Sequence, residues 1–180
     1  MSHPTRVALT RRQIVQRTAA ALALLTPVTA LRAAGANGSG PAGGPMVEVW
    51  KSPTCGCCKA WMAHLEREGF RVTAYDTGNT AARARMGIPS RLGSCHTARV
   101  QGYAIEGHVP AADIRRLLRE RPDAVGLAVP GMPLGSPGMD GPDYGNRTEP
   151  YEVLLVARDG STRVFNRYFQ PAARSGAPTG

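Results

Sequence analysis

The chain has 180 residues, of which 22 are Lys or Arg and 13 are Asp or Glu, giving a formal net charge of +9. Residues 1–36 hold five of the 22 basic residues and none of the 13 acidic ones, so the remainder carries only +4. A charge of this size, without a clustered basic stripe, argues against a nucleic-acid-binding protein. The part of the chain after residue 45 is long enough for one domain with one core.

The N-terminal segment, residues 1–36, has the pattern of an export signal. Arginines without any acidic residue precede an apolar run at residues 18–31, and Ala34-Gly35-Ala36 forms a small-residue cleavage site. The run is shorter than the roughly 20 residues of a membrane-spanning helix, so we expect no permanent membrane anchor. Arg11-Arg12 also matches a twin-arginine signal, and export by either route places a bacterial protein in the periplasm. The alternative, a disordered basic arm, has no need of the apolar run.

The rest of the chain divides by composition into three parts. Residues 37–45 are rich in Gly and Pro and are expected to form a flexible linker. Residues 46–170 contain the alternating apolar patterns of a folded domain, and residues 171–180 are expected to be a disordered tail.

Three of the four cysteines lie within Thr54-Cys55-Gly56-Cys57-Cys58. Residues 46–50 before this segment have strand character, and the apolar residues after it recur at helical spacing. Thr54 is the expected N-cap, which would place the sulfurs over the first helical turn. Unpaired backbone N–H groups and the helix dipole at that turn favour thiolates, the form that attacks disulfides and binds soft metals.

The elements expected next are inferred from apolar periodicity and turn residues. They are a strand at residues 70–75, a short helix from Asn79 to Met86, a hairpin of residues 97–100 and 103–106 around Gln101-Gly102, and a helix from Pro110 to Pro122. Residues 129–139 contain Pro-Gly-Met twice and fit neither helix nor strand. Residues 151–156 and 162–165 form a second expected hairpin, added to the same sheet.

The expected order β-α-β-α-β-β-α, with cysteines at the first strand-to-helix junction, is that of an α/β thioredoxin-like fold. Residues 94–118 are similar to the matching part of glutaredoxins. In such folds the loop before the hairpin packs against the active-site cysteines and usually carries a cis proline, whose place is taken here by Cys95-His96-Thr97. The resemblance implies that Cys95 approaches the other three cysteines.

Two chemistries are open to these sulfurs. Cys55 and Cys58 have the C-x-x-C spacing, which allows a disulfide or a shared metal ion. Cys57 is not needed for dithiol exchange, and its sulfur converges with the others only if Cys55 lies in the loop before the helix. In the alternative interpretation Cys57 is a small core residue and Cys55 to Cys58 a structural disulfide.

Among metals, this thiolate density favours Cu(I), including several ions that share sulfur ligands. Zinc is less favoured, because structural zinc sites typically pair two C-x-x-C knuckles and Cys95 stands alone. His96 and His108 are further candidates as nitrogen ligands. Met132 and Met139 are candidates as thioether ligands, since an exposed methionine in a Pro-Gly loop is not readily explained as core.

The same residues resemble the CopG-type periplasmic copper-resistance family, a metal-binding domain of unknown function. The motifs that carry the resemblance are residues 51–61, Ser94-Cys95-His96-Thr97, Gly102-Tyr103, residues 105–110 and residues 130–139. The resemblance implies a thioredoxin-like fold, an exported protein associated with copper handling, and metal bound by Cys55, Cys57, Cys58 and Cys95.

The favoured hypothesis is a periplasmic copper-binding protein with a Cu(I)/Cu(II) redox role in copper resistance. A second hypothesis is a thiol-disulfide oxidoreductase, an enzyme in which Cys55 attacks and Cys58 resolves. A third is a non-catalytic module that delivers copper to other periplasmic copper-handling proteins, docking through residues 132–139.

Overall fold

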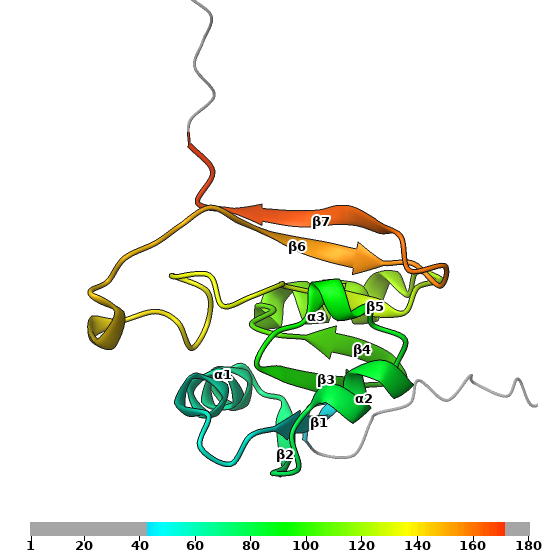
Figure 1. The fold of residues 1–180 in the computed structure, drawn as a ribbon, viewed down its shortest axis with the longest axis horizontal. Coiled ribbons are helices and arrows are strands. Elements are labelled where there is room, and N and C mark those ends of the chain that lie inside the picture. The colour runs from blue at the N-terminus through cyan, green and yellow to red at the C-terminus, as the bar shows by residue number, and fades with distance from the viewer. Residues whose placement is uncertain (1–42, 172–180) are drawn as a thin grey trace, which may run out of the picture. The chain divides into compact units, whose positions relative to one another are not determined.

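In the part of the chain that the structure describes, seven strands form one mixed sheet, in the order β2-β1-β3-β4-β5-β6-β7 (Figure 1). The structure is a computed structural model that describes residues 43–171. The expected export signal, most of the expected linker and all but the first residue of the expected tail lie outside the described residues. Within residues 43–171, no helix is both long enough and apolar enough to cross a membrane.

The first three elements form the expected β-α-β unit. They are β1 (Met46–Lys51), α1 (Gly56–Arg67) and β2 (Arg71–Tyr75), and the two strands pair in parallel. α1 buries Cys58, Trp61 and Leu65, because this spacing puts the three side chains on one face of a helix. The predicted strand, helix and strand are therefore confirmed.

The next elements also match the sequence patterns. They are α2 (Thr80–Arg85), β3 (His96–Val100), β4 (Tyr103–Glu106) and α3 (Ala111–Glu120). β3 and β4 pair antiparallel around Gln101 and Gly102, whose φ angles of 46° and 87° suit a tight hairpin turn. β3 begins at His96, so Cys95 is the last residue before the sheet.

The strand β5 (Gly126–Ala128) was not predicted. It pairs in parallel with β4 and antiparallel with β6 (Tyr151–Val156). A Cβ atom on Gly126 would lie 1.8 Å from the Ala104 carbonyl oxygen, so only glycine fits beside β4. The apolar run at residues 124–129 is the signal that indicates this buried strand.

The predicted C-terminal hairpin is confirmed and extends the sheet. β6 pairs antiparallel with β7 (Thr162–Tyr168), which ends three residues later than expected. Residues 129–139 contain no helix or strand, as expected, and lie between α1 and the hairpin (Figure 1). Two short 3-10 helices, η1 (Ser90–Leu92) and η2 (Pro142–Tyr144), were not predicted.

The hydrophobic core lies on both faces of the sheet. Alternate residues of β4 and β5 point to opposite faces, so Ile105 and Leu127 pack with α1 and α3, whereas Ala104 and Ala128 pack with the segment around α2 and η1. The cysteine segment is attached to the first face through α1.

Candidate metal centre

The N-cap of α1 lies one residue later than predicted. Cys55, not Thr54, is the N-cap, and its Sγ accepts the Cys58 backbone N–H at 3.3 Å. The Thr54 hydroxyl instead lies 3.2 Å from the Ser52 hydroxyl. Cys55 therefore lies in the loop before the helix, which is the condition that allows the sulfur of Cys57 to turn toward it.

The four cysteine sulfurs all lie within 4.8 Å of one another. The Sγ atom of Cys57 is 3.5 Å from that of Cys55 and 3.7 Å from that of Cys95. The Cys58 and Cys95 Sγ atoms are 3.4 Å apart. The structure thus brings Cys95 to the other three, although 37 positions separate it from Cys58 in the chain.

Two of the four cysteines are joined covalently in the structure. Cys55 and Cys58 form a disulfide across the first turn of α1, and Cys57 and Cys95 are free thiols. All four sulfurs are available as thiolates only after this disulfide is reduced.

Two buried histidines adjoin Cys95. His108 Nδ1 donates to the Pro137 carbonyl oxygen at 2.8 Å, so Nε2 carries the free lone pair and lies 3.1 Å from Cys95 Sγ. His96 Nδ1 lies 3.4 Å from the same sulfur, while its Nε2 has no hydrogen-bond partner among the described residues. Burial lowers the pKa of both imidazoles, which are therefore neutral and able to bind a metal ion.

The thiolates expected from the helix dipole are those over the first turn of α1, and Cys95 is not one of them. Burial, with the neighbouring Cys57 as the next cause, raises the pKa of Cys95 to about 12. Cys95 lies in the loop before β3 rather than on α1, so the dipole of that helix does not govern it. A bound metal cation would oppose this rise in pKa, because its charge favours the thiolate.

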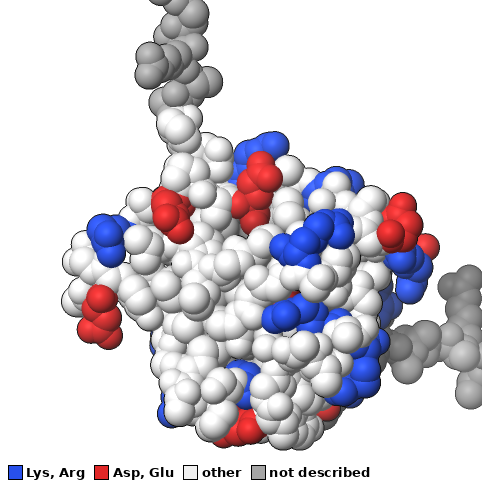
Figure 2. Space-filling view, in the orientation of Figure 1, with Lys and Arg blue, Asp and Glu red and all other residues white. Residues whose placement is uncertain are grey.

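The Pro-Gly-Met loop forms a wall of the site. A Cβ atom on Gly138 would lie 2.6 Å from the Cys57 carbonyl oxygen, so the loop rests directly on the first turn of α1. Met132 is 50% exposed, as expected, but Met139 is only 8% exposed and the expectation of an exposed side chain there was wrong. Figure 2 shows that the surface over α1 and this loop is mostly uncharged, while Lys and Arg gather on the other side of that face.

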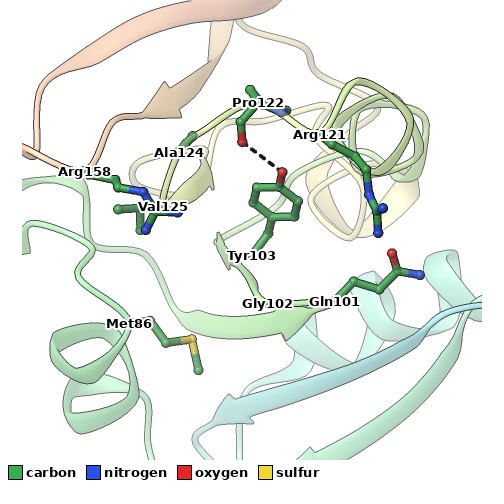
Figure 3. Close-up of a pocket in the computed structure, with 9 residues that line it drawn as sticks. All are labelled: Met86, Gln101, Gly102, Tyr103, Arg121, Pro122, Ala124, Val125 and Arg158. Carbon is green, nitrogen blue, oxygen red and sulfur yellow. Dashed lines mark hydrogen bonds between the residues drawn. The ribbon is translucent and has the colours of Figure 1, made fainter. Parts of the chain in front are cut away.

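A separate pocket lies at the opposite end of β4 (Figure 3). It has a volume of about 390 Å³ and is lined by Met86, Gln101, Gly102, Tyr103, Arg121, Pro122, Ala124, Val125 and Arg158. Arg158 is neutralised by Asp123 at 2.5 Å, and the Tyr103 hydroxyl donates to the Pro122 carbonyl oxygen. None of the cysteines borders this pocket, which is therefore separate from the candidate metal centre.

The donor set fits a soft metal ion. Sulfur ligands about 2.3 Å from a tetrahedral ion are about 3.8 Å apart. The non-bonded sulfur separations of 3.4 to 3.7 Å between neighbouring cysteines are close to that value. Once the Cys55 to Cys58 disulfide is reduced, a set of four sulfurs with these separations could hold a soft metal ion.

Two solved structures match the chain closely. One, described as "Copper resistance protein copG- Form 2", is 47% identical, covers 69% of this chain and 98% of that chain, and gives a TM-score of 0.64. The other, "Copper resistance protein copG- Form 1", is 48% identical, covers 68% and 96%, and gives 0.63. The chain belongs to the CopG-type family. A family profile described as "Protein of unknown function, DUF411" matches residues 92–139 of this CopG-type chain. No curated protein matches the chain.

Behind the cysteines, a buried carboxylate pairs with a partly buried arginine, and the sequence patterns did not predict this pair. Glu106 is fully buried at the end of β4 and pairs with Arg83 of α2 at 2.8 Å. A charged residue inside an otherwise apolar hairpin strand is the one sequence signal that points to Glu106. Nothing comparable identifies Arg83 among the alternating alanines and arginines of its helix.

Proposed function

We propose that this chain is a periplasmic copper-binding protein in which Cys55, Cys57, Cys58 and Cys95 bind Cu(I). The observation that carries the proposal is the convergence of four sulfurs within 4.8 Å. It is supported by 47% identity to a protein described as a copper resistance protein, over 98% of that protein's chain. Soft thiolates bind Cu(I) in preference to hard cations, and thiolates can bridge more than one Cu(I) ion.

The Cys55 to Cys58 disulfide must be reduced before all four cysteines can bind copper. A dithiol reductant transfers two electrons to the Cys55 to Cys58 disulfide and leaves as a disulfide itself, giving two thiols. Each cysteine then loses its proton to solvent as it becomes a ligand. His108 and His96 border Cys95 as nitrogen donors, and Met132 and Met139 remain thioether candidates in the adjoining loop. Bound copper would supply one-electron Cu(I)/Cu(II) chemistry, the basis of a redox role in copper resistance.

Anaerobic reconstitution tests the copper proposal. The mature protein, reduced with a dithiol and freed of reductant, is expected to take up Cu(I) and to retain it through gel filtration. Cys57→Ser and Cys95→Ser are each expected to lower the bound copper per protein. The proposal fails if the reduced wild type takes up no Cu(I), or if both substitutions leave its copper content unchanged.

A second function is favoured by the disulfide at the start of α1. In a thiol-disulfide oxidoreductase, the Cys55 thiolate would attack a substrate disulfide and Cys58 would displace the substrate thiol, leaving the protein disulfide and a reduced substrate. Insulin reduction by metal-free protein separates the two functions. This function requires Cys57→Ser to retain activity, whereas copper binding by all four cysteines requires it to lose copper.

A third function is favoured by the half-exposed Met132. A delivery module would transfer Cu(I) to a copper-free periplasmic partner without net oxidation or reduction of the metal. We expect Cu(I) transfer to the partner to be slower for Met132→Ala than for wild type. The oxidation state of copper is expected to stay constant during the transfer.

A periplasmic location and a thioredoxin-like fold are part of the same proposal. The export pattern of residues 1–36 supports a periplasmic location, and the element order from β1 to α3 supports a thioredoxin-like description. Fractionation of a bacterium that expresses the full chain checks the location: the mature protein is expected in the periplasmic fraction, shorter than its precursor.

A further inference from the structure

The segment that carries Cys95 lies between two regular elements. η1 ends at Leu92 and β3 begins at His96, so no strand or helix fixes the backbone of residues 93–95. On the C-terminal side, His96 is held by its pairing with Lys51 of β1. The contacts on the N-terminal side therefore help to set the backbone that carries the Cys95 sulfur.

The side chains of buried Glu106 and of partly buried Arg83 and Asn79 hold both peptide groups of Ser94, the residue before Cys95. The Ser94 N–H donates to Glu106 Oε1 at 2.7 Å. The Ser94 carbonyl oxygen accepts from Arg83 Nη2 at 2.7 Å and from Asn79 Nδ2 at 3.0 Å. Side chains here replace the hydrogen bonds that a strand would have supplied.

Glu106 and Arg83 form one unit around this residue. Arg83 Nε donates to Glu106 Oε1 at 2.8 Å, and the Thr97 hydroxyl donates to Glu106 Oε2 at 2.6 Å. The carboxylate therefore connects the loop before Cys95 with the strand after it. Arg83 binds the carboxylate and the Ser94 carbonyl through separate nitrogens, which the fork of a guanidinium permits and a lysine ammonium does not reproduce.

The surroundings leave this loop little room to shift. A Cβ atom on Gly107 would lie 2.5 Å from both the Ser94 hydroxyl oxygen and the Val129 carbonyl oxygen. The Ser94 hydroxyl donates to the Gly131 carbonyl oxygen, which joins the loop to the Pro-Gly-Met wall. Neither Arg83 nor Glu106 is among the residues that could bind the metal ion themselves.

We infer that Arg83 and Glu106 are positioning residues that hold Ser94, and through it the Cys95 sulfur, in the geometry of the metal site. This inference rests on the proposed copper site and adds residues that do not touch the metal. Partners that orient ligands from behind typically change metal affinity 10- to 100-fold when removed.

The test compares Cu(I) affinity in Arg83→Met and wild type, measured by competition with a chromophoric Cu(I) chelator. Arg83→Met is expected to weaken Cu(I) binding about ten-fold. The matched control is Asp113→Asn, which changes a buried carboxylate away from the cysteines and is expected to leave the affinity within about two-fold of wild type. An affinity in folded Arg83→Met equal to that of wild type overturns the inference.

A double-mutant cycle separates positioning from general destabilisation. If Arg83 acts through Cys95, its removal is expected to change the affinity little once Cys95→Ser is present. An equal loss in both backgrounds overturns the inference, because it shows that Arg83 does not act through Cys95. If Arg83→Met alone does not fold, Arg83→Met with Glu106→Gln removes both charges together and is used instead.

A metal-free readout keeps the inference distinct from the copper proposal. The alkylation rate of Cys95 in reduced, metal-free protein, followed by peptide mass spectrometry, is expected to rise several-fold in Arg83→Met and not in Asp113→Asn. If the wild type binds no Cu(I), the copper proposal fails and this rate alone decides the positioning role. Equal rates in wild type and Arg83→Met would then falsify it.

Discussion

Glu106 and Asp113 are two buried carboxylates with different partners. Glu106 has the Arg83 guanidinium and the backbone next to Cys95, whereas Asp113, 2% exposed on α3, accepts from neutral donors only. Asn166 Nδ2 and the Tyr168 hydroxyl donate to Asp113 at 2.9 and 2.7 Å, which attaches β7 to α3. No ion pair among residues 43–171 includes Asp113.

Because of this difference, we expect Glu106 to support the candidate metal site and Asp113 to support the fold alone. Burial raises the pKa of Glu106, and the donors on Thr97, Ser94 and Arg83 act against that rise. Ser94 and Arg83, which favour the charged form of Glu106, thus also belong to the contacts that hold the loop before Cys95. Changes at Glu106 should therefore affect both stability and Cu(I) affinity, and changes at Asp113 only stability.

The largest effect is expected from Glu106→Ala. It leaves the Arg83 guanidinium largely buried without its partner, and we expect a loss of about 3 kcal/mol in the free energy of unfolding. Urea denaturation of the metal-free, reduced protein measures this loss. A loss below about 1 kcal/mol would show that Arg83 finds solvent easily and that the pair is not tightly held.

Asp113→Ala is expected to cost about 2 kcal/mol, because it leaves the donors of Asn166 and Tyr168 without an acceptor. The same urea experiment measures it, and chelator competition is expected to give a Cu(I) affinity within about two-fold of wild type. A ten-fold weaker affinity would contradict the separation between the two carboxylates.

Tyr168→Phe is expected to cost about 1 kcal/mol, since it removes one hydrogen bond to Asp113. The ring remains available to stack on Tyr151, whose centroid is 4.9 Å away. Thermal unfolding of the two proteins side by side checks this value. A cost as large as that of Asp113→Ala would mean that Tyr168, rather than the carboxylate, holds the hairpin.

The smallest effect concerns His64, which lies on α1 and contacts neither the Arg83 to Glu106 pair nor the Asp113 carboxylate through a hydrogen bond. Its Nε2 accepts the Ala111 N–H at the start of α3, and burial lowers the pKa of its imidazole. The charged neighbours Glu68 and Asp140 raise that pKa, while Arg67 and Arg115 lower it.

Because the folded state disfavours protonation of His64, its contribution to stability is present above about pH 6.5 and is lost as pH falls below that value. His64→Gln keeps an acceptor that does not titrate. Between pH 7.5 and 5 we expect wild type to lose a few tenths of a kcal/mol more than His64→Gln, because half of the side chain is screened by solvent. Parallel losses in the two proteins would show that His64 does not contribute.

Most elements and the meeting of the cysteines were predictable from the sequence. Helical spacing indicated α1 and α3, and alternation indicated the hairpins. The resemblance to thioredoxin-like folds implied that the loop before β3 brings Cys95 to the other cysteines. These signals are local, or they rest on the order of the elements. β5 was missed because three residues are too few for a period, although they lie within a buried apolar run.

The interactions behind the site were not predictable, for a physical reason. Which donor faces Glu106 depends on packing between segments that are distant in the chain, such as Arg83 and Ser94, and no periodicity encodes it. The same limit explains Met139, whose burial depends on how the Pro-Gly-Met loop folds back. Thr54 and Cys55 are adjacent, and the sequence does not reveal that the Cys55 sulfur rather than the Thr54 hydroxyl caps the helix.

The long connection between β5 and β6 has a consequence for how such proteins can diversify. The two strands are adjacent in the sheet, so residues 129–150 leave it and return to the neighbouring position. Loop-closure entropy rises only slowly with length, so insertions in the outer part, around η2, should add little folding cost. The inner part is fixed by Gly138 against α1 and by the hydrogen bond from His108 to Pro137. The outer loop can therefore be exchanged without changing the register of any strand, and such an exchange would alter what reaches the proposed metal site.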